Sequence, residues 1–429
     1  ACNTVIFDEA HQLPETARLF FGESLTTSQL IELSRDARAE LRSAGGASPE
    51  LEALANRLER AMRDLRLALG DAPARFAWPQ AMRLTGFPEA LVKLRAALKM
   101  LDAALAAHAE RSEGLGACSR RAGNAYGVLR RLLETDAHED VRWAEAIGQT
   151  VQLHVTPLHS GELFRRQMAD HPRAWVFTSA TLAVGDDFGH FTRELGVPEA
   201  ETRRWESPFR FGEQALIYLP PGLPPEPNDP AFTDAVVEAA YPVLEASGGR
   251  AFLLFTTLRA LRRAHDLLRG RLPYPLLVQG TGSRSDLLTR FRSLGNAVLL
   301  GSASFWEGVD VRGEALSLVV IDKLPFAPPD DPVLAARIDA LKAAGRNPFN
   351  ELQLPQAVLQ LKQGAGRLIR DEGDRGVLML CDPRLLSRPY GARVLASLPP
   401  MKRTRSLEEV QAFFATLDES RARLRCESG

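Results

Sequence analysis

Two short apolar runs, each ending in polar residues, constrain the fold of this chain more than any other feature. Residues 4–7 (TVIF) lead directly into Asp8 and Glu9, and residues 174–177 (AWVF) lead into a segment that contains Ser179. Runs of this composition are typical of buried strands, and the polar residues after them lie at the carboxyl edge of a sheet. A strand–helix–strand unit needs only about 30 residues, whereas 171 positions separate Asp8 from Ser179. We therefore predict a helical domain inserted between two neighbouring strands.

The residues between these runs carry long amphipathic patterns. Residues 25–108 show no strand signal, and leucines recur at three- and four-residue steps in 51–69 and 91–108. This spacing is typical of helices with one buried face. We interpret both stripes as core, and His108 as a residue at the core edge rather than a ligand. Loops are predicted at 72–79 and 85–88, where proline and glycine interrupt the pattern.

A basic set follows, with Tyr126 among its members. It could contact a strand of DNA or form a solvated helix face, and we favour the solvated face. Its arginines are Arg120, Arg121, Arg130 and Arg131.

Strand-like runs and helical patterns alternate in the C-terminal half, which predicts a mostly parallel sheet wrapped by helices. The runs cover residues 251–255, 276–279, 297–300, 316–321 and 377–381, and the helical patterns cover 258–268, 285–294, 331–344 and 355–369. A proline-rich run at 219–227 is predicted to be part of a linker. The predicted boundaries place 1–24 and 150–206 in a first α/β domain, 25–149 in the insertion, and 207–429 in a second α/β domain.

Composition limits the class of protein without naming it. The chain has 429 residues, is 45% hydrophobic and carries a formal net charge of -1, so a polyanion can bind only at local basic clusters. No run of 18 apolar residues occurs, and none resembles a signal peptide. The cysteines are too scattered for a CxxC metal site or a disulfide framework, which favours a reducing cytoplasm. They are Cys2, Cys118, Cys381 and Cys426.

The acidic pair after the first run suits nucleotide hydrolysis. Asp8 can hold a magnesium ion and Glu9 can orient water, although an acidic pair at a strand end is more often merely solvated. Hydroxyl and small residues at 178–182 can hydrogen-bond both these acids and a bound polyanion. This stretch could therefore couple the two.

Arginines in the segment Gln363-Gly-Ala-Gly-Arg-Leu-Ile-Arg370 supply the strongest second signal. We predict that it is helical, with Arg367 and Arg370 on one side and suited to a triphosphate as arginine fingers. Its glycines would permit close approach by a facing domain. A loop at 301–310 follows a strand-like run and could sense both a nucleotide and a nucleic-acid backbone.

In this order, the VIFDEAH, TSATL, SPF, LFTT, GSASFWEGVD, LPF and QGAGRLIR segments resemble the superfamily 2 DNA helicases of the XPD and DinG type, and the bacterial DinG/YoaA branch fits best. The likeness runs from residue 1 to about residue 400, and the helical insertion is similar to the family's Arch domain. The resemblance implies two RecA-like domains, the first incomplete here, which hydrolyse ATP, walk 5′ to 3′ along single-stranded DNA and open duplexes in DNA repair or replication. We expect a cytoplasmic monomer that acts on single strands and on forked or displaced duplexes.

The resemblance also implies roles for individual residues. Asp8 would bind Mg²⁺, Glu9 would activate water, and Arg367 and Arg370 would act on the phosphates of ATP from across a cleft. The remaining candidates are Gln363, Gly308 and Asp310 for the nucleotide, His11, Ser179, Thr181 and Glu307 for coupling hydrolysis to movement, and Thr257 and Gln279 for the nucleic-acid backbone.

Two departures from the family pattern matter. No G-x-x-x-x-G-K-[ST] phosphate loop occurs in the sequence, and the four cysteines that hold the family's 4Fe-4S cluster normally precede DEAH, where only Cys2 stands. We therefore expect an N-terminally truncated helicase that binds ATP poorly by itself, with the cluster in the missing part. The alternatives are a non-catalytic module that binds single-stranded nucleic acid or a partner, and an RNA-directed DEAH-box helicase.

Overall fold

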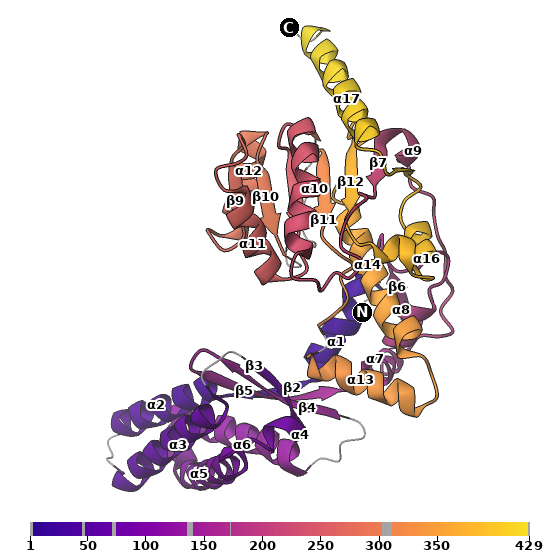
Figure 1. Ribbon diagram of the computed structural model, residues 1–429. Coiled ribbons are helices and arrows are strands. Elements are labelled where there is room, and N and C mark those ends of the chain that lie inside the picture. The colour runs from indigo at the N-terminus through magenta and orange to yellow at the C-terminus, as the bar shows by residue number, and fades with distance from the viewer. Residues whose placement is uncertain are drawn as a thin grey trace. The chain divides into compact units, whose positions relative to one another are not determined.

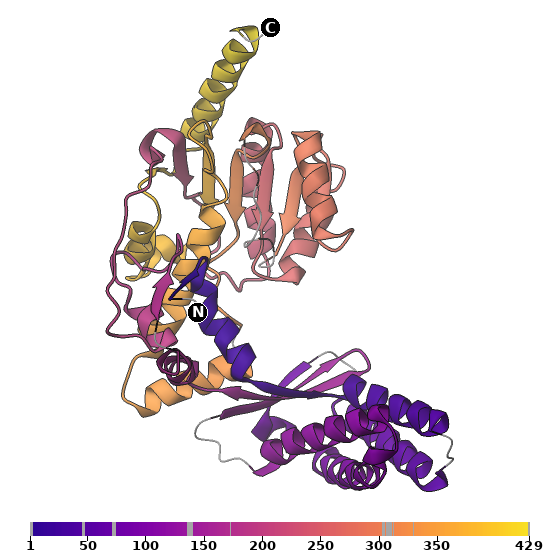
Figure 2. The same ribbon diagram turned by 180° about the vertical axis from the view of Figure 1, so that it is seen from behind.

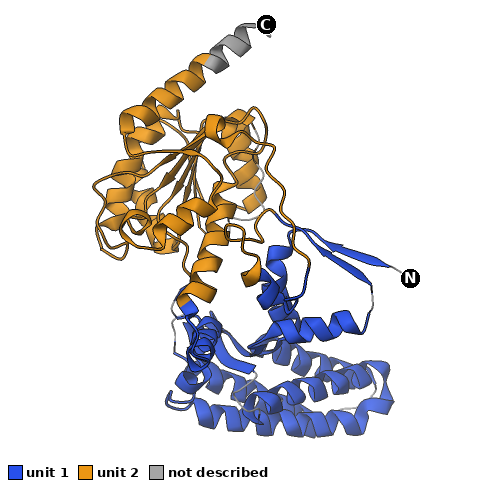
Figure 3. Cartoon of the chain, turned by 90° about the vertical axis from the view of Figure 1, so that its right-hand side faces the viewer, with its two compact units in different colours: residues 1–179, 191–200, 327–348 blue, residues 180–190, 201–326, 349–429 orange. Residues whose placement is uncertain are grey.

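The computed structural model describes residues 3–44, 48–70, 74–134, 140–171, 173–302, 305, 311, 313–328 and 330–427, with side chains to residue 419. Glu307, Gly308 and Asp310 lie outside these residues. The chain forms two compact units (Figure 3), and each is described by itself. Unit 1 contains residues 1–179, 191–200 and 327–348, and unit 2 contains residues 180–190, 201–326 and 349–429. None of the described helices is long and apolar enough to cross a membrane.

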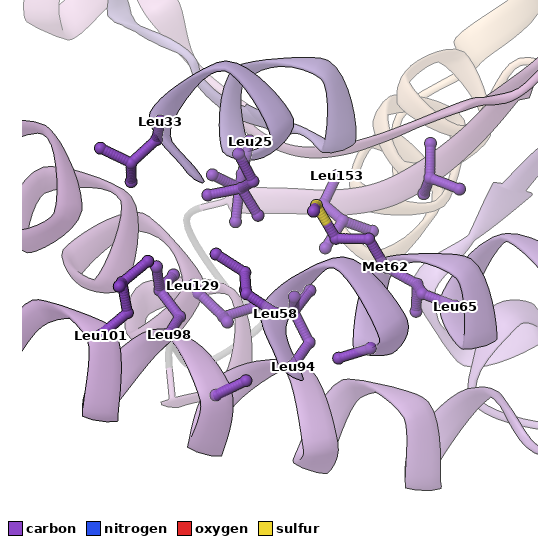
Figure 4. Close-up of a cluster of buried hydrophobic side chains, with 14 of the residues drawn as sticks. Leu25, Leu33, Leu58, Met62, Leu65, Leu94, Leu98, Leu101, Leu129 and Leu153 are labelled. Atoms are coloured by element: carbon purple, nitrogen blue, oxygen red, sulfur yellow. The ribbon is translucent and has the colours of Figure 1, made fainter. Parts of the chain in front are cut away.

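Long helices form most of the predicted insertion, as the leucine spacing requires (Figures 1 and 2). They are α2 (Thr27–Ser43), α3 (Pro49–Ala68), α5 (Phe87–His108) and α6 (Glu113–Glu134). Figure 4 shows leucines of α3 and α5 meeting in one apolar core, with Leu58, Leu65, Leu94 and Leu98 all buried. Both predicted leucine stripes are thus confirmed as core, and His108 is half-buried at the end of α5.

An antiparallel sheet in the order β2-β5-β4-β3 packs against these helices. Its strands are β2 (Glu23–Thr26), β3 (Ala74–Ala77), β4 (Asp140–Ile147) and β5 (Thr150–Pro157). The expectation of no strand in 25–108 is wrong for β3 and for the end of β2, because four-residue edge strands are too short to show an alternating pattern. The loops expected at 72–79 and 85–88 are likewise replaced in part by β3, by α4 (Trp78–Ala81) and by the start of α5.

Strand β5 belongs to this antiparallel sheet, and its apolar and polar residues alternate. It pairs with β2 and β4 and not with the strands at 4–7 and 174–177. Side chains of Val151, Leu153 and Val155 face the helical core, which explains the alternation in physical terms. The predicted domain boundaries stay predictions.

Strands β1 (Thr4–Phe7) and β6 (Ala174–Phe177) pair in parallel, in register from Thr4↔Ala174 to Phe7↔Phe177. This confirms the prediction that two neighbouring strands flank a long insertion. The elements packed nearby are η1 (Ala10–Gln12), α1 (Leu13–Phe21), α7 (Ser160–Ala169), α8 (Gly189–Leu195) and α13 (Pro332–Ala343).

Unit 2 is built on a parallel sheet in the order β13-β7-β12-β11-β8-β10-β9. Its strands are β7 (Ala215–Tyr218), β8 (Ala251–Leu254), β9 (Leu276–Val278), β10 (Val298–Gly301), β11 (Leu318–Ile321), β12 (Gly376–Leu380) and β13 (Lys402–Thr404). The five predicted strands are confirmed. Strands β7 and β13 were not predicted. Strand β7 lies beside the proline-rich run that was predicted to be a linker, and β13 has a charged sequence.

Helices cover both faces of this sheet, which is why its strands are apolar at consecutive positions. One face packs against α10 (Phe232–Ala246), α11 (Leu258–Leu268) and α17 (Leu407–Glu427), and the other against α12 (Arg284–Leu294), α14 (Leu354–Ala365) and α16 (Gly391–Ser397). The remaining described helices of unit 2 are α9 (Phe211–Gln214), α15 (Arg384–Ser387), η4 (Gly313–Ala315) and a π-helix, η5 (Phe349–Gln353).

Candidate functional site

The carboxyl ends of β1 and β6 bring the acidic and hydroxyl residues together. Because the strands are in register, Asp8 and Thr178 follow paired residues. The Thr178 hydroxyl donates to Oδ1 of Asp8 at 3.0 Å, and its backbone N–H donates to the carbonyl of Phe7 at 2.8 Å. Thr178 therefore fixes the position of the carboxylate.

Aromatic packing holds this strand pair together on one face. Phe7 stacks on Trp175 and Phe177, with ring centroids 6.1 and 5.8 Å apart, and Phe164 of α7 packs edge-on against Phe7. Such pairs contribute about 0.5–1.5 kcal/mol each beyond the area they bury. The packing sets the level at which the polar residues leave the sheet.

Glu9 adopts a left-handed backbone conformation, with φ 50° and ψ 38°. This region is sparsely populated by residues other than glycine, and such strain clusters at functional sites. The N–H of Glu9 donates to Oδ1 of Asp8 at 2.9 Å, and that of Ala10 donates to the carbonyl of Thr178 at 2.9 Å. The turn at Glu9 is therefore fixed to the Asp8 side chain and to the residue that follows β6.

Three side chains of the predicted site meet beyond this turn. The Ser179 hydroxyl donates to Oε2 of Glu9 at 3.2 Å and lies 3.0 Å from Nδ1 of His11, which is 3.3 Å from the same glutamate oxygen. A serine has a single hydroxyl proton, so a serine that donates to Glu9 requires His11 to donate from Nδ1. The other ring nitrogen, Nε2, is buried and has no hydrogen-bond partner among the described residues.

Asp8 fits the predicted magnesium ion. Its side chain is exposed, and the hydrogen bonds from described residues reach Oδ1 and not Oδ2. Mg²⁺ is commonly held by one or two carboxylates together with waters and the phosphates of a nucleotide. No cluster of three or more metal-binding side chains occurs among the described residues.

A group of charged side chains anchors the helix that follows DEAH. Glu194 of α8 accepts hydrogen bonds from Arg18 of α1, at 3.2 Å, and from Arg337 of α13. All three side chains are less than one-fifth exposed, and burial lowers the pKa of Arg337. One carboxylate thus ties α1, α8 and α13 together within unit 1.

In unit 2 the candidate residues occupy separate places. Thr257 caps α11, accepting the N–H of Ala260 at 3.2 Å. Oε1 of Gln279 accepts from the N–H and the hydroxyl of Ser302, at 2.6 and 2.9 Å. Thr181 is buried. The structure therefore gives Thr257 and Gln279 structural contacts, and their predicted contacts with nucleic acid stay predictions.

The segment with the predicted arginine fingers is helical only in part. Helix α14 ends at Ala365, and Arg367 follows in a tight turn in which its N–H donates to the carbonyl of Gly364 at 3.2 Å. The expectation that Arg367 and Arg370 share one helix face is therefore wrong. Gly366 favours the helix end, and Gln363 and Arg367 are both largely buried.

Asp374 holds the backbone beyond that turn. Its carboxylate accepts N–H groups from Arg370 and Asp371 at 2.8 Å and from Gly313 at 3.0 Å, and the side chain is buried. Gln214 adds hydrogen bonds to carbonyls of the same loop. The conformation around Arg370 thus depends on a buried carboxylate that the sequence patterns did not single out.

Comparisons with known proteins agree with these motifs. A family profile described as "Helicase C-terminal domain" matches residues 241–401. The ATP-dependent DNA helicase YoaA of Escherichia coli (strain K12) is 42% identical over 413 residues, which cover 96% of this chain and 65% of the relative. YoaA of Haemophilus influenzae is 40% identical over 95% of this chain and 64% of its own length, and the ATP-dependent helicase DinG of Mycobacterium tuberculosis is 37% identical over 68% and 43%.

Solved structures show the same fold. The Xpd4 structure from S. tokodaii has a TM-score of 0.59 at 15% identity and covers 94% of this chain and 75% of its own. A structure titled XPD helicase has a TM-score of 0.55 at 16% identity and covers 94% and 68%. The chain belongs to the XPD/DinG-type helicases of superfamily 2.

The predicted α/β class with RecA-like parallel sheets is therefore confirmed for this XPD/DinG-type chain. It spans about two thirds of the length of the YoaA relatives that it matches. Unit 1 brings together Asp8, Glu9, His11 and Ser179, as predicted. Thr178 joins them as one of the hydroxyl residues at 178–182 that were expected to hydrogen-bond the acids.

Proposed function

We propose that this chain carries most of an ATP-dependent DNA helicase that moves 5′ to 3′ along single-stranded DNA and opens forked or displaced duplexes in repair or replication. The similarity to YoaA and DinG, which are named ATP-dependent helicases, supports helicase activity and ATP dependence. We place the protein in the cytoplasm as a monomer. The observation that carries the proposal is the hydrogen-bonded set that joins Asp8 and Glu9 to Thr178 and Ser179.

The proposed chemistry divides between two neighbouring carboxylates. Asp8, held through Oδ1, would bind Mg²⁺, which neutralises charge on the phosphates of ATP when it is bound. Glu9 is 65% exposed and would orient a water and take its proton as general base. Ser179 and His11 hold Oε2 of Glu9, so a shift of β6 would change the position of the base. This link is how hydrolysis and movement would be coupled.

Roles in nucleotide chemistry are also proposed for residues of unit 2. We propose phosphate contacts for Arg367 and Arg370, nucleotide contacts for Gln363, Gly308 and Asp310, and coupling roles for Thr181 and Glu307. Guanidinium groups bind phosphate through paired N–H donors, which supports the choice of Arg367 and Arg370.

A substitution at Glu9 tests the proposal in a form of the protein that also has a phosphate loop. Glu9→Gln keeps the size of the side chain but removes the base, so we expect ATP turnover stimulated by single-stranded DNA to fall at least about 100-fold, with ATP binding retained. Glu15→Gln is the matched control, because Glu15 is an exposed carboxylate on α1, and it should change turnover less than twofold. Full turnover by Glu9→Gln would contradict the proposed role.

The same assay separates the alternatives. Stimulation by single-stranded RNA rather than DNA would favour an RNA-directed enzyme, and tight DNA binding without turnover would favour a binding module. By itself the 429-residue chain should hydrolyse no ATP, because its sequence contains no phosphate loop. A 4Fe-4S cluster is not assigned to this chain, and Cys118 and Cys381 are both buried free thiols.

A further inference from the structure

A groove of about 560 Å³ lies in the helical insertion, between α2, α3 and the turn that joins β4 to β5. Arg35 and Arg38 of α2 and Arg63 and Arg66 of α3 line it, with Glu59 as its acidic residue. Each arginine pair is three residues apart, which places both members on one face of their helix. The formal charge of the lining is therefore +3.

Hydrogen bonds neutralise only part of this charge. Glu59 binds Arg38 at 2.7 Å and lies 3.9 Å from Arg63, which is 73% exposed. Arg66 donates to the backbone carbonyls of Gly148, at 2.7 Å, and Gly70. Arg35 is exposed and makes no ion pair with any described residue. Arg35 and Arg63 are thus available to an anion.

The basic set that the sequence singled out differs in this respect. Arg121 pairs with Asp36 at 2.6 Å, and Arg131 forms two bonds of 2.5 Å with Glu23. Arg130 lies 3.8 Å from Glu134. Three of the four arginines of that set are thus paired, which favours the solvated helix face for it, while Arg120 forms no ion pair with a described residue.

Apolar side chains lie among the groove arginines. Ile31 is 40% exposed and Leu67 is 74% exposed, while Met62 is buried in the core beneath them. A single strand presents unstacked bases together with phosphates, whereas a duplex hides the faces of its bases. Guanidinium groups can bind the phosphates or stack on the bases. This combination favours a single strand.

We propose that the groove binds the phosphate backbone of single-stranded DNA, with Arg35 and Arg63 as the phosphate-binding residues and Ile31 and Leu67 against the bases. Phosphate is the chemistry that the groove recognises. The choice of DNA as its source rests on the proposed function.

Charge reversal tests this proposal in the full chain. We expect Arg35→Glu/Arg63→Glu to weaken binding of a labelled oligo-dT by tenfold or more in fluorescence anisotropy at low salt. The slope of log affinity against log salt should also fall by about 1.4, since each phosphate contact on a single strand contributes about 0.7. The control is Lys99→Glu/Arg120→Glu, which changes two exposed cations on α5 and α6 by the same net charge and should alter neither quantity by more than about twofold.

Further binding and competition measurements identify the ligand. A duplex of equal length should lose less affinity than oligo-dT, and millimolar inorganic phosphate or ATP should not displace the oligonucleotide. Displacement by ATP at these concentrations would overturn DNA as the ligand in favour of a free nucleotide. A folded groove variant that keeps wild-type affinity for DNA would also overturn DNA as the ligand. An acidic protein surface would then fit the groove better. Circular dichroism checks folding, and Arg35→Gln/Arg63→Gln replaces the first variant if it fails to fold.

The outcome of the groove test does not depend on the outcome of the Glu9→Gln test. A groove variant that loses DNA affinity while Glu9→Gln keeps full turnover would support the groove and refute the proposed catalysis. The opposite pair of results would refute the groove alone.

Discussion

The two sheets end in polar residues that differ sharply in their surroundings. At the end of β1, Glu9 is 65% exposed and Asp8 is also exposed. At the ends of β11 and β12, Asp322 and Asp382 are only 3% and 4% exposed. Both groups accept hydrogen bonds from the adjacent strand end, so burial rather than bonding distinguishes them.

The strands themselves show the same contrast. Ile6 of β1 and Val176 of β6 are 67% and 40% exposed, whereas the described residues of β8, β10, β11 and β12 are all buried. A carboxylate at the end of a fully covered sheet is desolvated with it and must be paired there. Carboxylates at the end of the open strand pair remain accessible to water and to an incoming ligand. Carboxylates that follow strand ends are thus buried and paired in unit 2 and accessible to solvent in unit 1.

Asp382 should be the most costly of these residues to remove. Its carboxylate accepts the N–H of Leu324 at 2.7 Å and binds the side chain of Arg384 at 2.6 and 2.9 Å. Asp382→Ala leaves a half-buried guanidinium and a buried N–H without their acceptor, so we expect the free energy of unfolding of unit 2 to fall by about 3–5 kcal/mol. Urea unfolding, with hydrogen exchange to locate the change in unit 2, measures the effect.

Two further variants sharpen this result. Asp382→Ala/Arg384→Met should recover part of the lost stability, because no unpaired cation remains. Asp266→Ala, at a 69% exposed carboxylate on α11, should change stability by less than about 0.5 kcal/mol. Equal losses for Asp382→Ala and Asp266→Ala would show that burial does not separate the two kinds of carboxylate.

Asp322 should make the stability of unit 2 depend on pH. Burial raises its pKa to about 7, although Lys323 and hydrogen bonds from Lys323 and Thr256 act in the opposite direction. The unfolded carboxyl ionises near its ordinary pKa of 3.8. Between these values the folded state binds the extra proton, so this contribution is complete below about pH 4 and is lost as the pH rises through about 7. It amounts to about 4 kcal/mol at most.

Comparison with Asp322→Asn isolates this contribution. The neutral amide should flatten the pH dependence between pH 4 and 7 and be more stable than the wild type at pH 8, as measured by urea unfolding at each pH. Parallel curves for the two proteins would contradict a raised pKa.

The sequence predicted the features that repeat with a period. The leucine stripes of α3 and α5 and the apolar runs of β8 to β12 are direct consequences of burial on one or both faces. Short or charged edge strands such as β3 and β13 carry no such period and were missed. Strand β5 alternates because one of its faces packs on the insertion's own core, and such a pattern carries no information about the strand's partners.

The candidate site was predicted by order along the chain rather than by contacts. Register explains why Asp8 and Ser179 converge, since two parallel strands that begin together also end together. The backbone conformation around Arg370 was not predicted, because it depends on Asp374, whose carboxylate accepts N–H groups from Arg370 and Gly313. A contact of this kind joins residues that are distant in sequence and leaves no periodic trace. The groove arginines were not predicted for the same reason, since they come from two separate helices.

The smallest effect comes from the backbone of Glu9. A variant with glycine at a given position is normally less stable than one with alanine by about 0.5–1 kcal/mol, because glycine loses more backbone conformational freedom on folding. At a φ of 50° the order should reverse, since a left-handed conformation costs a residue with a Cβ about 1–2 kcal/mol. We therefore expect Glu9→Gly to be more stable than Glu9→Ala by up to about 1 kcal/mol in urea unfolding, with slower hydrogen exchange in β1 and β6. Both variants lose the same contacts with Ser179 and His11, so a reversed order reports the strain of the left-handed backbone. The ordinary order, with alanine more stable, would show that the turn at Glu9 is not held left-handed, and the accessible end of β1 would then lack the strain that separates it from the relaxed, buried ends of β11 and β12.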